Sequence, residues 1–318
     1  MRTLELAIDP AADGRTVLSL LRRELACSDA HISRLKRRET GILLNETRCY
    51  VTARVKAGDI LRVEIGDLPD GHIVPMPFAL DVRFEDEDLL ILDKPAGIAV
   101  HQSTRDPEEL TLENAVCHYL GGTISPHPVS RLDRGTSGLI AFAKSGYIHE
   151  RLRRQMHSTL YQRAYLGIAV GRVEPPSGTI DLPIGMAEGS TYQRAICQNG
   201  QSAQTQYETL ANNVRYSLLR LVPQTGRTHQ LRLHMAAVGF PLAGDWLYGA
   251  EAPELIARPA LHSAELTLTH PVTGESLHLC SALPADMRTL MDDVFSKREE
   301  EANFRQQGDT FNKSEETI

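Results

Sequence analysis

The most informative stretch of the chain is RLDRGTSGLIAFA, at residues 131–143. Its first part places one carboxylate, Asp133, between Arg131 and Arg134 in a short polar turn, and its second part, 139–143, is apolar throughout. An uninterrupted apolar run of this length predicts a buried strand. The neighbouring guanidiniums favour the ionised carboxylate, which makes Asp133 a candidate nucleophile. The alternative is a turn Asp that only caps the strand.

Composition limits the class of protein. The 318 residues are 42% hydrophobic, enough for one large domain or two smaller ones. Because no run of about 18 apolar residues occurs and residues 1–5 do not begin a signal peptide, we expect no membrane association. The five cysteines are scattered without a C-x-x-C pair, which favours reduced thiols over disulfides or a zinc site. The sequence therefore predicts a cytoplasmic protein.

The charge is distributed unevenly. The formal net charge is −7, yet residues 14–66 contain 11 Lys and Arg against 6 Asp and Glu. Three basic residues that are candidates for RNA contact, Arg34, Lys36 and Arg37, are expected on the polar side of one predicted helix. Such a cluster indicates either an RNA-binding face or simply a solvated charged helix.

This first region, residues 1–67, is predicted to be a compact helix-helix-strand module. One helix begins near residue 17, and a second has Asp29 as its N-cap and Gly41 as its C′ residue. Extended segments are expected at 42–44, 51–55 and 60–65.

The rest of the chain is predicted to form an α+β domain at 80–296, after a linker at 68–79, with a polar tail at 297–318 that is expected to be disordered. Strands are expected at 82–85, 89–92, 139–143, 164–170, 204–210, 217–222, 261–269 and 276–279, and helices after Thr111, Ser145 and from Thr228. Because the strands outnumber the helices and come in clusters, the sheet should be mixed and largely antiparallel, with flanking helices.

Three residues could act together with Asp133. Arg227 precedes the predicted helix at Thr228 and could pair with the carboxylate, or else contact a phosphate or solvent. Tyr165 lies in a predicted strand, where it is either a core residue or a stacking surface for a base. Arg131 is two residues from Asp133 and shares its side if the segment is extended.

No other chemistry is indicated by the sequence. His229 and His234 are five residues apart, a spacing that does not place both on one helical face, so a metal pair is not expected. Ser-His-Asp and Cys-His arrangements lack supporting context, and nothing places Asp181 or Asp245 near Asp133. The residues thus favour one anion acting without a cofactor or metal.

The motifs resemble those of RluA-type RNA pseudouridine synthases over roughly residues 80–284. The matching stretches are LLILDKPAGIAVH, SRLDRGTSGLI, RAYLGIAVG, TGRTHQLRLHMAAVGFPLAGDWLYG and RPALHSAELTLTHPVTGESLHLCSALP. Residues 14–66, which contain VKAGDILRVEI, are similar to an S4-type RNA-binding domain. The resemblance implies a pseudouridine synthase fold and a cofactor-free isomerase of structured RNA, with 23S ribosomal RNA favoured over transfer RNA.

The resemblance also implies roles for residues. Asp133 would be the catalytic nucleophile, Arg227 its salt-bridge partner, and Tyr165 the residue that stacks on the target uracil. Arg131 would enter the RNA helix where the uridine leaves it, and Arg134 would help to bind the substrate. Two positions depart from the family pattern: Ser130 stands where His is usual, and Arg163 stands where Lys is common.

Two alternatives belong to other functional classes. A nucleosidase or glycoside hydrolase could use Asp133, but such enzymes generally need two carboxylates. A non-catalytic RNA-binding or ribosome-assembly factor could keep the fold without using Asp133. We expect a monomer in each case.

Overall fold

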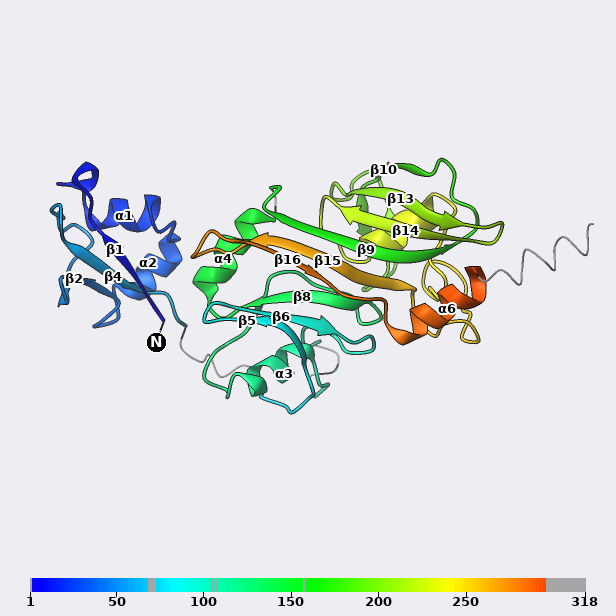
Figure 1. Cartoon of the computed structure of the whole chain (residues 1–318), viewed down its shortest axis with the longest axis horizontal. Helices are drawn as coiled ribbons and strands as arrows, with labels where there is room; N and C mark the ends of the chain where they lie inside the picture. Colours follow the sequence, from blue (N-terminus) through cyan, green and yellow to red (C-terminus); the bar gives the residue numbers. More distant parts are fainter. Residues whose placement is uncertain (1, 68–72, 104–105, 107, 157, 296–318) are drawn as a thin grey trace, which may run out of the picture.

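The computed structural model describes residues 2–67, 73–103, 106, 108–156 and 158–295. Figure 1 shows a small N-terminal module beside a larger domain that is built on one long sheet. The predicted tail at 297–318 and the first part of the predicted linker lie outside the described residues. In the described part of the chain, no helix is long and apolar enough to cross a membrane.

The N-terminal module combines two helices with a four-stranded sheet in the order β1-β4-β2-β3. Its elements are β1 (Thr3–Ala7), the 3-10 helix η1 (Pro10–Ala12), α1 (Val17–Arg23), α2 (Asp29–Leu35), β2 (Ile42–Leu44), β3 (Thr47–Arg48) and β4 (Ile60–Glu64). The two predicted helices and the strands near residues 42 and 60 are confirmed. The extended segment predicted at 51–55 is wrong: it turns, with one isolated bridge between Arg54 and Thr16.

Both predicted ends of α2 also need correction. The N-cap is Ser28, whose hydroxyl accepts a hydrogen bond from His31 N at 3.2 Å, so Asp29 is the first helical residue. The helix ends at Leu35, well before Gly41. Gly41 is required for another reason: a β-carbon there would lie 2.3 Å from Leu35 O, so only glycine allows this close approach.

The larger domain is confirmed as α+β. Its ten-stranded sheet has the order β10-β13-β14-β9-β15-β8-β6-β5, with β16 paired to β15 and β7 to β8. The strands are β5 (Asp81–Glu85), β6 (Leu89–Lys94), β7 (His127–Pro128), β8 (Ser137–Ala143), β9 (Tyr161–Val170), β10 (Ser177–Asp181), β13 (Gln204–Asn212), β14 (Tyr216–Pro223), β15 (Leu261–Thr269) and β16 (Ser276–Cys280); β11 (Ile184–Met186) and β12 (Arg194–Ile196) form a separate pair.

The sheet is mixed but largely antiparallel, as the sequence predicts. Among the described strands, β8 and β15 form the one parallel pair. The domain's helices are α3 (Leu112–Tyr119), α4 (Gly146–Gln155), α5 (Gln230–Ala237) and α6 (Ala285–Phe295).

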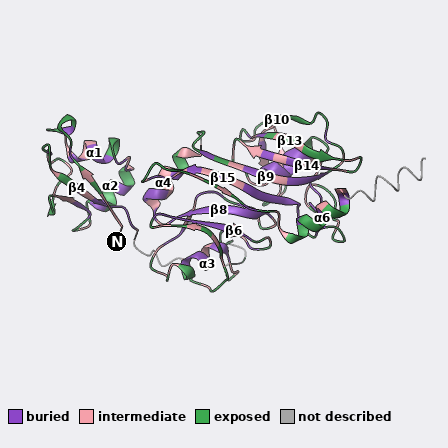
Figure 2. Ribbon diagram, in the orientation of Figure 1, coloured by how far each residue is buried: buried purple, intermediate pink, exposed green. Residues whose placement is uncertain are grey.

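Strand β8 is buried along its whole length, which confirms the interpretation of the apolar run (Figure 2). Gly138 has a positive φ of 108°, and a β-carbon on it would lie 2.2 Å from Ser263 O in β15. Only glycine permits this approach of the two strands. The glycine that ends the polar turn therefore fixes the turn at the centre of the sheet.

The two faces of β8 contribute to different cores. Ile140 and Phe142 pack in a cluster that includes Tyr165 and residues of α3 and α5. Leu139 and Ala141 belong to a second cluster that continues into the N-terminal module. The central strand thus connects the pocket side of the sheet to the module.

The N-terminal module is packed directly against the larger domain, with α4 at the contact (Figure 1). The hydroxyl of Tyr147 donates to Leu25 O at 2.6 Å. Asp67, at the end of the module, accepts hydrogen bonds from Gly146 N and from His127 Nε2, and its other oxygen lies 3.4 Å from Arg34 Nη1. One buried carboxylate therefore joins the module to both α4 and β7.

Candidate active site

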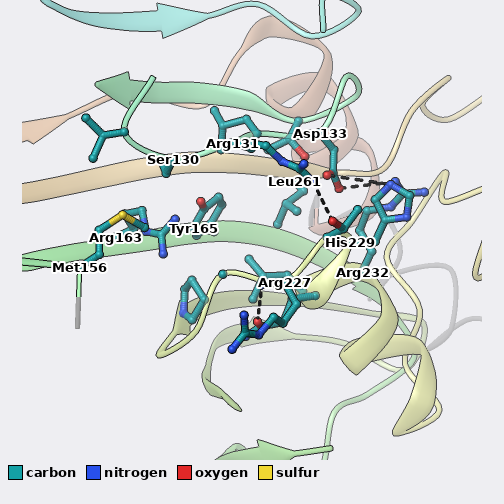
Figure 3. Close-up of a pocket in the computed structure, with 18 of the residues that line it drawn as sticks. Ser130, Arg131, Asp133, Met156, Arg163, Tyr165, Arg227, His229, Arg232 and Leu261 are labelled. Atoms are coloured by element: carbon teal, nitrogen blue, oxygen red, sulfur yellow. Dashed lines mark hydrogen bonds and ion pairs between the residues drawn. The ribbon is translucent and has the colours of Figure 1, made fainter. Parts of the chain in front are cut away.

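A pocket of about 380 Å³ opens at the turn that precedes β8 (Figure 3). Its walls come from this turn, from β9, from the β14–α5 connection and from the start of β15. Of the described residues that line it, Asp133 is the one carboxylate. Guanidinium groups line the same pocket and belong to Arg131, Arg163, Arg227 and Arg232.

The turn that carries Asp133 is held from beneath by hydrogen bonds to its backbone. Lys94 is fully buried, and its Nζ donates to Arg134 O at 3.2 Å and to two further carbonyls at 2.9 Å. Arg258 Nη1 donates to Gly135 O at 3.0 Å. Burial lowers the pKa of Lys94 to about 7, although the Asp133 carboxylate favours its charged form. These contacts fix the two backbone carbonyls that follow directly after Asp133.

Of the side chains that the structure describes, Arg232 presents the cation closest to Asp133. Its Nη1 lies 3.5 Å from Asp133 Oδ2, and its Nε and Nη2 both bond Asp245 at 2.8 Å. Burial favours the neutral guanidine, but the hydrogen bonds and charge of Asp245 outweigh it, so the pKa of Arg232 is raised. A buried bidentate pair of this kind holds the guanidinium in one orientation. Arg232 is thus fixed as a charged donor facing Asp133.

His229 faces Asp133 from a second direction. Its Nε2 lies 4.0 Å from Asp133 Oδ1, and its Nδ1 lies 2.9 Å from the Tyr248 hydroxyl. That hydroxyl accepts a hydrogen bond from Arg194 N at 3.0 Å. When the Tyr248 hydroxyl donates its hydrogen bond to Nδ1, the ring of His229 carries its proton on Nε2, on the side of Asp133. Burial lowers the pKa of His229 and so favours the neutral ring. The negative charge of Asp133 acts in the opposite direction but is the smaller effect.

The backbone of His229 is in the left-handed region, with φ of 59°. This conformation is costly for a residue with a side chain and is found preferentially at functional sites. It also corrects the predicted start of the helix, because α5 begins at Gln230 and not at Thr228. The displaced start places Arg232, in the first turn of α5, opposite Asp133.

The predicted pairing of Arg227 with Asp133 is wrong. Arg227 lines the pocket, but its Nε donates to Ser202 O at 3.0 Å, and among the described residues the ion-pair partners of Asp133 are Arg232 and His229. The left-handed turn at His229 separates Arg227 from the helix that presents Arg232 (Figure 3).

The other predicted pocket residues are brought together. Tyr165, 5% exposed, projects from β9 into the pocket lining, and Ser130 also lines it. Arg131 is exposed at the rim, and its Nη2 donates to Thr228 Oγ1 at 2.7 Å. Arg134 does not line this pocket: it is paired with Glu109 through both terminal nitrogens. Its contact with RNA stays a prediction.

The three residues of the module that are predicted to contact RNA lie on α2 and just beyond its end, and they do not line the pocket. Lys36 and Arg37 are exposed, whereas Arg34 is half exposed and lies near Asp67 and His31. Within the described part of the chain, no group of three or more His, Cys, Asp or Glu side chains could hold a metal ion.

Sequence reasoning missed four members of the site: Arg232, Asp245, His229 and Tyr248. Nothing in the sequence places Asp245 near Asp133, yet in the structure it is the buried partner of the Arg232 that faces Asp133. No signal in the sequence separates Arg232 from Arg227, because both lie at the start of the predicted helix. The arrangement presents one carboxylate to the pocket, facing Arg232 and His229, with Tyr165 in the same pocket lining.

The comparisons with known proteins agree with this geometry. Residues 88–237 match the family model described as RNA pseudouridylate synthase. An uncharacterized RNA pseudouridine synthase, YhcT of Bacillus subtilis, is 36% identical over 93% of this chain and 98% of its own length. Ribosomal large subunit pseudouridine synthase D of Nitrosomonas europaea is 36% identical over 76% of this chain and 73% of its own.

The solved structure of human RNA pseudouridylate synthase domain containing 1 is similar with a TM-score of 0.53 and 25% identity, over 65% of this chain and 86% of that one. Sequence and fold thus agree across most of the chain. The chain belongs to the RNA pseudouridine synthases, which are isomerases that act on RNA.

Proposed function

We propose that this enzyme converts a uridine of structured ribosomal RNA to pseudouridine, with Asp133 as the nucleophile and without a cofactor. The observation that supports this role is the place of Asp133: it is the one carboxylate among the described pocket residues, and it faces Arg232 and His229. A hydrolase that needs two carboxylates is not favoured by this lining.

Binding begins when the target uridine leaves its stack, which costs a few kcal/mol. Tyr165 is positioned to stack on the extruded base, and Arg131 is positioned at the rim to occupy the space that the base leaves. Stacking of a base on an aromatic ring is worth about 1–3 kcal/mol, enough to offset much of this cost.

The isomerisation breaks the N1–C1′ bond, turns the uracil and forms a C5–C1′ bond. The hydrogen on C5 leaves as a proton, and N1 gains one, so no oxidant or reductant is needed. Asp133 must be ionised whether it attacks the sugar or the base, or promotes elimination at the ribose. Arg232 and His229 face this carboxylate from two directions, and Lys94 holds the backbone of its turn.

We further propose that residues 1–67 are an S4-type RNA-binding domain, joined by a linker at 68–79 to a catalytic domain at 80–296. Ribosomal RNA is favoured as the substrate because a relative named ribosomal large subunit pseudouridine synthase D is 36% identical. A transfer RNA is the alternative. The proposal includes a monomeric, cytoplasmic enzyme.

The test is to map pseudouridines in total RNA from a deletion strain that carries an empty vector, the wild-type gene or the Asp133→Asn gene. We expect one or a few ribosomal RNA positions to lose pseudouridine and to regain it with the wild-type gene alone. Loss at transfer RNA positions would move the substrate to that class. An unchanged map, or release of free uracil by the purified enzyme, would refute the proposed function.

A further inference from the structure

Three arginines at the mouth of the pocket have no carboxylate partner among the residues that the structure describes. Arg131, Arg163 and Arg227 come from the Asp133 turn, from β9 and from the β14–α5 connection (Figure 3). Among the described residues, none of the three forms an ion pair with Asp or Glu, whereas Arg232, deeper in the pocket, forms two. Their positive charge is therefore not neutralised within the described part of the protein.

Each of these guanidiniums is nevertheless held in place, by a neutral group. Arg131 Nη2 donates to Thr228 Oγ1 at 2.7 Å, and Arg227 Nε donates to Ser202 O at 3.0 Å. Arg163 lies over the Tyr161 ring, 5.8 Å from its centroid. Such contacts orient a guanidinium but leave its charge intact, and they leave nitrogens of Arg131 and Arg227 free to donate to a ligand.

The three side chains also meet on one short segment, residues 226–228. Arg227 belongs to it, Arg131 bonds Thr228, and Arg163 Nη2 lies 3.7 Å from the position that a β-carbon on Gly226 would occupy. The segment is itself fixed, because Arg227 N donates to Gln230 Oε1 at 3.0 Å. Like charges gathered on a fixed segment repel one another unless an anion lies between them.

We propose that Arg163 and Arg227 form a phosphate-binding site for the RNA backbone on either side of the target uridine, whereas Arg131 keeps the role at the rim proposed above. This inference rests on the proposed function, because a base inserted toward Asp133 leaves its own phosphates at the pocket mouth. Arginine suits the role, since its planar fork of donors matches phosphate oxygens. Arg227 thus binds the RNA backbone and does not act on the Asp133 carboxylate.

The experiment measures binding of a fluorescein-labelled RNA stem-loop with one loop uridine, at several salt concentrations. Neutralising two phosphate contacts by Arg163→Gln and Arg227→Gln should lower the slope of log affinity against log salt by about 1.4–1.8. Between 50 and 200 mM salt, the wild type should therefore lose roughly 7- to 12-fold more affinity than the double variant. KM should rise in the same variant.

Arg172→Gln is the matched control, because Arg172 is an exposed arginine paired with Glu174 beyond the end of β9. It should keep the wild-type slope. A second probe has neutral methylphosphonate linkages on either side of the uridine, and it should abolish the difference between wild type and double variant. Equal slopes for wild type and double variant, with both folded by thermal melting, would overturn the phosphate site.

Failure of this inference is distinguishable from failure of the proposed function. If the wild-type enzyme forms no pseudouridine but the double variant has a lower salt slope than the wild type, the proposed function is refuted and the phosphate site is retained. If the wild-type enzyme forms pseudouridine but the two slopes are equal, the proposed function is retained and the phosphate site is refuted.

Discussion

Replacing Arg232 with Gln removes the cation closest to Asp133. At the observed separation of 3.5 Å and an effective dielectric constant of about 20, the attraction is roughly 5 kcal/mol. The Asp133 side chain is 22% exposed, so water screens part of this. We therefore expect the variant to lose about 2–3 kcal/mol of transition-state stabilisation, which corresponds to a roughly 30- to 150-fold fall in kcat/KM.

The same substitution also affects folding, because Asp245 is fully buried and would lose its partner. Breaking a buried ion pair from one side typically costs about 3–5 kcal/mol of unfolding free energy. The double variant Arg232→Gln with Asp245→Asn avoids this uncompensated charge. We expect it to recover much of the stability in urea unfolding but none of the activity.

The assay is release of tritium from C5-tritiated uridine in RNA. Circular dichroism first shows that each variant is folded at the enzyme concentration used. Arg220→Gln is the control: it removes an arginine that pairs with Glu265 at 2.7 Å and does not line the pocket. It should keep wild-type turnover. A folded double variant that retains turnover within twofold of the wild type would refute the assigned role of Arg232.

Three further predictions concern the surroundings of the site. Tyr248→Phe removes the hydrogen bond of about 0.5–1.5 kcal/mol that orients His229, so turnover should fall roughly two- to tenfold without loss of RNA binding; unchanged turnover would contradict this. Burial acts to raise the pKa of Asp67, but hydrogen bonds from His127 and Gly146 N lower it overall. Its stabilisation is therefore complete above the unfolded-state pKa of about 3.9 and is lost as pH falls below it. Asp67→Asn should cost about 1–3 kcal/mol at pH 7 in urea unfolding, and this difference should shrink toward pH 3; a pH-independent difference would count against the linkage. Reversing the charges of Lys36 and Arg37 to Glu should weaken RNA binding and reduce its salt slope, whereas an unchanged slope would mean that this face is only solvated.

The sequence was informative where one physical signal dominates. The apolar run at 139–143 is compatible with burial on both faces, and β8 is buried on both. The missed strand β1 does carry a signal, because Leu4 and Leu6 alternate with Thr3 and Glu5. The other missed strands, β3, β7, β10, β11 and β12, have at most five residues each and are polar or mix polar and apolar side chains. Pairing with other strands makes them extended, and that pairing is not visible locally.

The error at Arg227 has an equally specific cause. The prediction assumed a helix that starts at Thr228, and nothing in the sequence shows that His229 adopts a left-handed conformation. The helix begins two residues later than predicted, at Gln230, and Arg232 in its first turn faces Asp133 in place of Arg227. The contact of the module with α4 was likewise not predictable, because Leu25 and Tyr147 are brought together only by tertiary packing.

The central claim is that the Asp133 carboxylate carries out the isomerisation. The most direct measurement is single-turnover tritium release from C5-tritiated RNA by Asp133→Asn, with binding of the same RNA measured in parallel. We expect no release above background and a dissociation constant within a few-fold of the wild type, because the amide keeps the shape but loses the anion. Wild-type release by this variant would contradict the account.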